Sequence, residues 1–247
     1  MRRALVLAIT LASGLAPAHV APSVDDNNRY LKVTPLGDRV RLAYTVFFGE
    51  VPGATARQSI DTNRDGSISG AEADSFGTRV AGDVAAALEV TIDGGPTKVA
   101  WSQLDVGMGS PKTAAGAFSI DMVAYFCLPA ARGQHAVRVR DRYRIARPGE
   151  TEVKVEDSPG ITVHHARIGA ADDPTHDYRF VGPGGPLSDD GLDVSFTAGE
   201  AAQISGTCGT TTKPRTIPTL AIVGAAAVLG FVLAAIVVLV RRHKRRT

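Results

Sequence analysis

The stretch Phe118-Ser-Ile-Asp-Met-Val-Ala-Tyr-Phe-Cys-Leu128 decides the expected fold class of this 247-residue chain. All of its even-numbered residues are apolar, whereas its odd-numbered residues include Ser119, Asp121 and Cys127. Successive side chains of a strand point to opposite faces. The alternation therefore predicts a long strand with one face in a hydrophobic core.

Shorter stretches on both sides of this strand alternate in the same way. They predict a hairpin over residues 31–48, a strand pair over 90–101 that turns at 93–96, and strands over 137–145, 161–163 and 192–196. Residues 169–191 are rich in Asp, Pro and Gly and are expected to form one long loop. About eight to ten strands in all indicate a mainly β, sandwich-like fold.

One predicted strand carries a row of arginines opposite its apolar face, Arg138, Arg140, Arg142 and Arg144. Such a row could bind an acidic partner. We favour a solvated face instead, because Glu152 and Glu156 on the following strand could form cross-strand ion pairs with it.

A second informative stretch, Asp61-Thr-Asn-Arg-Asp-Gly-Ser-Ile-Ser-Gly-Ala-Glu72, has the spacing of an EF-hand calcium loop. Gly66, at position six, permits the positive φ of the turn around an ion, and Ile68 points back into the fold. Calcium prefers six to eight oxygen ligands. The predicted metal residues are Asp61, Asn63, Asp65, Ser67, Ser69 and Glu72.

Helical stretches flank this loop, a short one over residues 54–60 and a longer one over 71–88. The alternative interpretation is an acidic surface turn. Only three carboxylates are present, which suits a weak extracellular site. No second loop matches, because the acidic stretch at 189–193 has its glycine at the wrong position.

Both ends of the chain indicate export and anchoring. Residues 1–18 have the charged start, apolar centre and Ala-Pro-Ala end of a signal peptide, although an uncleaved signal-anchor is the alternative. Residues 220–240 form an uncharged run that would span about 32 Å as a helix. The basic tail 241–247 follows, which predicts a cytoplasmic C-terminus. Between these segments we expect an extracytoplasmic domain over 19–208 and a Thr/Pro-rich stalk over 209–219.

Charge and cysteine content support this division. The ends hold 7 of the 27 basic residues and no acid, so the exported part has 20 basic and 25 acidic residues, a net charge of −5. This balance gives no support to nucleic-acid binding. Cys127 and Cys208 are expected to form a disulfide on the oxidising side of the membrane, although an intermolecular bridge stays open.

Catalytic motifs are scarce. The sequence has no HExxH, GxSxG, CxxC or phosphate-binding glycine loop, so we expect no enzyme. His164 and His165 are adjacent in a predicted strand and should face opposite sides. One of them could bind a transition metal with His176 or with His19, the first residue after signal cleavage.

The order of these elements resembles the extracytoplasmic EF-hand-containing domain found N-terminal in bacterial nickel/cobalt transporters and in HupE/UreJ-type membrane proteins. The resemblance covers roughly residues 29–168 and rests on Val51-Pro52, Ile60-Asp-Thr-Asn-Arg-Asp-Gly66 and Leu88-Glu-Val-Thr-Ile-Asp-Gly94. It implies metal binding through the loop residues named above. Those proteins have several membrane helices with histidines, whereas this chain has a single predicted span without histidine.

The sequence therefore predicts a calcium-binding extracytoplasmic module on a single membrane anchor. Its expected partners are the lipid bilayer and, as a candidate, a second membrane or surface protein. The alternative is an accessory subunit that binds nickel or cobalt for uptake or homeostasis.

Overall fold

The computed structural model describes residues 25–182 and 185–208, and they form two six-stranded sheets. The first sheet has the order β11-β8-β1-β2-β6-β5, in which only β1 and β8 run parallel. Its strands are Asn27–Pro35 (β1), Arg39–Phe48 (β2), Trp101–Gly107 (β5), Phe118–Cys127 (β6), Pro148–Val155 (β8) and Asp177–Val181 (β11).

The second sheet is antiparallel throughout and has the order β10-β9-β12-β7-β3-β4. Its strands are Leu88–Ile92 (β3), Gly95–Thr97 (β4), Gly133–Asp141 (β7), Ile161–Ile168 (β9), Ala171–Asp172 (β10) and Leu192–Ala198 (β12). The helices are Glu50–Ile60 (α1), Gly70–Ala87 (α2) and Gly185–Asp189 (α3). The prediction of a mainly β fold is confirmed.

The core lies between the two sheets, as the alternation predicted. Val40, Leu42 and Tyr44 of β2 are almost fully buried, and so are Ile120 and Met122 on the neighbouring β6. The inward residues of both sheets join one hydrophobic cluster. Burial of these apolar side chains, at about 25 cal/mol per Å², is the main force that holds the layers together.

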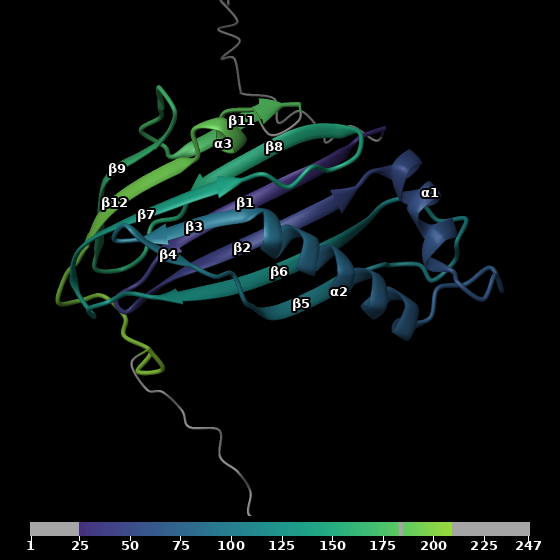
Figure 1. Cartoon of the computed structure of the whole chain (residues 1–247), viewed down its shortest axis with the longest axis horizontal. Coiled ribbons are helices and arrows are strands. Elements are labelled where there is room, and N and C mark those ends of the chain that lie inside the picture. The colour runs from purple at the N-terminus through teal and green to yellow at the C-terminus, as the bar shows by residue number, and fades with distance from the viewer. Residues whose placement is uncertain (1–24, 183–184, 209–247) are drawn as a thin grey trace, which may run out of the picture. The chain divides into compact units, whose positions relative to one another are not determined.

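The helix–loop–helix unit connects the sheets, because α1 follows β2 of the first sheet and α2 leads directly into β3 of the second. α2 packs along the edge strand β5. The indole N–H of Trp101 donates to the Ala81 carbonyl over 2.8 Å, and the Phe76 ring lies 5.9 Å from that of Phe48. In Figure 1 α1 and the loop that follows it extend beyond one end of the strands.

A buried polar network ties the sheets together inside the core. The Asp141 carboxylate of β7 accepts from the Arg29 guanidinium of β1 over 2.5 Å and from the Tyr44 hydroxyl of β2 over 2.8 Å. Its other oxygen accepts from the Tyr143 N–H. Burial raises the pKa of Tyr44 well above its ordinary value, so its hydroxyl keeps the proton that it donates.

Several predicted boundaries were wrong. α1 begins at Glu50 rather than at residue 54, because Pro52 is tolerated in the first turn, where backbone N–H groups have no intrahelical partner. Trp101 is not in the return strand of the 90–92 hairpin. That return is the short β4, and Trp101 begins β5 of the other sheet. The expected long loop 169–191 contains β10, β11 and α3.

The predicted strand over 137–145 ends earlier, because β7 stops at Asp141, so Arg142 and Arg144 lie beyond it. Three of the four arginines form ion pairs, but their predicted partners were wrong. Glu152 and Glu156 lie on and just after β8, which belongs to the other sheet. Glu89 on β3 instead approaches Arg142 to 2.6 Å and Arg140 to 3.6 Å, and Asp193 on β12 lies 3.6 Å from Arg138.

The end of the described chain is fixed to the β1–β2 turn. Cys127 and Cys208 form the predicted disulfide, with their α-carbons 5.3 Å apart. The Asp38 carboxylate accepts hydrogen bonds from the backbone N–H and the hydroxyl of Ser205. These contacts hold the last described residues beside Cys127, at the C-terminal end of β6.

The predicted signal peptide, stalk, membrane span and basic tail lie outside the described residues. Among the residues that the structure describes, no helix is long and apolar enough to cross a membrane.

Candidate metal centre

The loop between α1 and α2 holds its first carboxylate inward. Asp61 is only 7% exposed, and its two oxygens accept the backbone N–H groups of Asp65 and Gly66 over 3.2 and 2.9 Å. Gly66 has a φ of +84°, which favours glycine. Two backbone donors thus fix the buried carboxylate at the predicted first ligand position.

The next two predicted ligands form a chain of short contacts in the same loop. Asn63 Oδ1 accepts from the Asp65 N–H over 2.9 Å, and Asn63 Nδ2 donates to Asp65 Oδ2 over 3.0 Å. Asp65 Oδ1 accepts in turn from the Ser67 N–H over 2.8 Å. These side chains are exposed, so exchanging these bonds for an ion costs little desolvation.

Glu72 joins the two ends of the loop. Its Oε1 accepts from the backbone N–H and the hydroxyl of Thr62, over 2.8 and 2.7 Å. Its Oε2 accepts from the N–H and hydroxyl of Ser69, which forms a capping box at the start of α2. These bonds, with the Ser69 N–H first among them, lower the pKa of Glu72 to about 2. The side chain is therefore an anion over the whole ordinary pH range.

The donor set fits calcium in its chemistry. Every predicted ligand offers oxygen, and Asp61 is already directed by backbone donors. In the described part of the chain, however, no three His, Cys, Asp or Glu side chains gather closely enough to hold an ion. Glu72 is engaged by Thr62 and Ser69, so binding an ion requires it to exchange these bonds for the metal.

Sequence reasoning missed the segment that supports the loop from outside, residues 108–117. Ile68 N–H donates to the Pro111 carbonyl over 2.7 Å, and Thr113 N–H donates to the Gly66 carbonyl over 3.1 Å. Ser67 and Lys112 form an isolated antiparallel bridge. Ile68 itself is buried, as predicted. The segment has no periodic pattern, so nothing in its sequence indicates this pairing.

The two adjacent histidines of β9 do not face opposite sides. β9 pairs with β12 through His165 opposite Ser195 and Val163 opposite Phe196, so His164 is an extra residue in a β-bulge. His164 Nε2 lies 2.7 Å from the Thr197 hydroxyl on the outer face of the sheet. The expectation from regular strand geometry was therefore wrong, because the bulge shifts the alternation by one residue.

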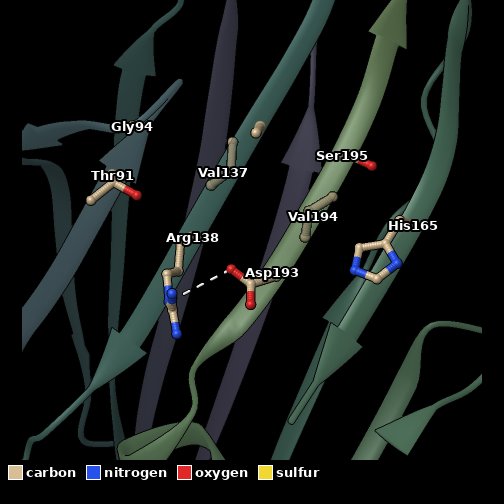
Figure 2. Close-up of a pocket in the computed structure, with 9 residues that line it drawn as sticks. Thr91, Gly94, Val137, Arg138, His165, Asp193, Val194 and Ser195 are labelled. Carbon is tan, nitrogen blue, oxygen red and sulfur yellow. Dashed lines mark ion pairs between the residues drawn. The ribbon is translucent and has the colours of Figure 1, made fainter. Parts of the chain in front are cut away.

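His165 lines a shallow hollow of about 260 Å³ on the same outer face. Figure 2 shows it with Asp193 and Ser195 of β12 and with Arg138 of β7, which pairs with Asp193. This hollow shares no residue with the α1–α2 loop.

Neither a scan against protein-family models nor a search of curated proteins finds a match for this chain.

Proposed function

We propose that this chain is a calcium-binding extracytoplasmic module, held at the cell membrane by one C-terminal span, with a non-enzymatic interaction or accessory role. The observation that carries the proposal is the loop of residues 61–72. Its spacing offers six oxygen ligands, and its first carboxylate is held inward by two backbone donors. The signal peptide and the span, read from the sequence, support export and anchoring.

Calcium in this site should stabilise the domain rather than switch it. Sensor EF-hands open to expose an apolar groove. Here α2 is fixed to β5 through Trp101 and to the core through Phe76, and α1 is fixed to residues 108–117 through Arg57. Opening these helices would break the packing of the core.

The test is calcium-dependent thermal unfolding of the soluble domain, with Glu72→Gln as the variant. A site with a dissociation constant of about 0.1 mM, in about 1 mM calcium, adds roughly 1.4 kcal/mol to the free energy of unfolding. We expect calcium to raise the melting temperature of the native domain by a few degrees and that of the variant hardly at all. The loss follows from removal of a carboxylate ligand.

The matched control is Asp74→Asn, which removes an exposed carboxylate on α2 outside the loop. It should keep the full calcium response. If millimolar calcium does not change the melting temperature of the native domain, residues 61–72 are an ordinary acidic turn and not a calcium site. A calcium-driven rise in binding of a hydrophobic dye would argue for a switch.

A second candidate function is transition-metal binding for nickel or cobalt handling, favoured by the bulge that places His164 and His165 on one face. Titration with Ni²⁺ should then broaden the imidazole NMR signals of both residues together. Unaffected imidazole signals at millimolar Ni²⁺ would exclude this site.

A further inference from the structure

A buried arginine on α1 organises the segment that pairs with the proposed calcium loop. The Arg57 side chain is fully buried, and every hydrogen bond that it donates within the described residues goes to a backbone carbonyl of this segment. Its Nε bonds to Gly116 over 2.8 Å, and its Nη1 bonds to Ser110 over 2.7 Å. Its remaining acceptors are the carbonyl oxygens of Lys112, Met108 and Ala117. One guanidinium thus binds five carbonyl oxygens of residues 108–117.

Close approach of α1 makes this arrangement specific. A β-carbon on Gly53 would lie 2.6 Å from the Gly116 carbonyl oxygen, and one on Gly116 would overlap the Glu50 carboxylate. That carboxylate accepts the Ala117 N–H over 3.2 Å. Glycine at both positions therefore permits a contact between α1 and residues 108–117 that any larger side chain would block.

The segment in turn fixes the backbone on both sides of Ser67. The Gly66 carbonyl accepts from the N–H and the hydroxyl of Thr113, each over 3.1 Å, and the Ile68 N–H donates to Pro111. Ser67 is the residue whose carbonyl is the expected ligand at position seven. The orientation of this carbonyl is thus set by residues 110–113 rather than by a second EF-hand loop.

We propose that residues 108–117 act as the structural partner of the calcium loop and that Arg57, as a positioning residue, sets the calcium affinity of the loop through them. The inference rests on the proposed calcium site. Residues that orient metal ligands without touching the metal change affinity by about 10–100-fold when they are replaced. Pre-organised ligands bind more tightly because less ordering is left for the binding step.

The test compares Arg57→Lys, which keeps the charge but cannot reach five carbonyls, with the native domain. Calcium affinity is measured by titration calorimetry at a temperature where both are folded by circular dichroism. We expect the dissociation constant to rise about 10–100-fold with one site retained. Thr113→Val, which removes only a hydroxyl bond to Gly66, should give a smaller rise. The control Arg79→Ala, which removes an arginine that stacks on Phe76 of α2, should stay within about twofold.

A measurement without calcium separates this inference from the proposed function. In the calcium-free protein, Arg57→Lys should speed the hydrogen exchange of the Ile68 and Thr113 amides. The guanidinium would no longer anchor residues 110–113, which carry the Pro111 acceptor of Ile68 and the Thr113 N–H itself. Unchanged exchange, or a folded Arg57→Lys variant with native calcium affinity, would overturn the inference. If the native domain binds no calcium, the proposed function and the role of Arg57 in affinity are both overturned, even where the Arg57→Lys variant exchanges these amides faster than the native domain. The pairing of the segment with the loop would then stand alone.

Discussion

Replacing Asp141 with alanine is expected to lower the free energy of unfolding by about 3–5 kcal/mol. The carboxylate is fully buried and accepts from Arg29, Tyr44 and the Tyr143 N–H. Its removal leaves the Arg29 guanidinium, itself 1% exposed, as a buried charge without its partner. Such an uncompensated charge costs far more than the loss of a surface ion pair.

Urea unfolding followed by circular dichroism measures this effect. The control is Glu200→Ala, which removes the partner of Arg132 from a pair whose carboxylate is 94% exposed and should change stability by less than about 1 kcal/mol. Tyr44→Phe should fall between the two, because it removes one donor and keeps the ring. If Asp141→Ala destabilised no more than Glu200→Ala, the network would not hold the sheets together.

Removal of the disulfide is the second large effect. The double variant Cys127→Ser/Cys208→Ser should lose roughly 4 kcal/mol, because the bridge joins residues 81 apart and restricts the unfolded chain. Asp38 would still hold Ser205 through two hydrogen bonds, so the folded state itself should change little.

The urea midpoint of the double variant gives this loss, and the native domain unfolded in reductant should match it. Reductant should leave the double variant unaffected. Equal midpoints for the native domain with and without reductant would show that the bridge does not contribute to stability.

The fold class could be predicted because alternation reports burial directly. The strands around Leu42 and Ile120 lie where the pattern placed them, each with one face in the core. The disulfide was predictable from the expected compartment and the even cysteine count. The helix predicted over 71–88 from its apolar spacing is α2, which runs from Gly70 to Ala87.

The neighbours of each strand were not predictable, because alternation gives the face of a strand and not its partner. β1 pairs with β8 across more than a hundred residues. Arg138 and Arg140 of β7 pair with Asp193 and Glu89, and not with the glutamates that follow them along the chain. The bulge at His164 depends on the register of β12, so it leaves no signal in the sequence of β9 alone.

Only part of the candidate site was visible in the sequence. The ligand spacing is local and therefore readable. Arg57, by contrast, resembles any helical surface arginine, and its burial depends on carbonyls more than fifty residues away. The engagement of Glu72 by Thr62 was likewise not expected from the ligand pattern.

The most direct test of the calcium site is an amide NMR titration of the soluble domain with calcium, followed at Gly66. Its N–H donates to the proposed ligand Asp61, and its carbonyl accepts from Thr113. A metal at the loop should therefore move the Gly66 signal, and those of Ile68 and Thr113 with it, along one saturable curve of a single site. The Glu72→Gln variant should need a much higher calcium concentration for the same shift. Extracellular calcium modules have dissociation constants of about 0.1–1 mM. A Gly66 signal that does not move up to about 10 mM calcium would therefore contradict a calcium site in this loop.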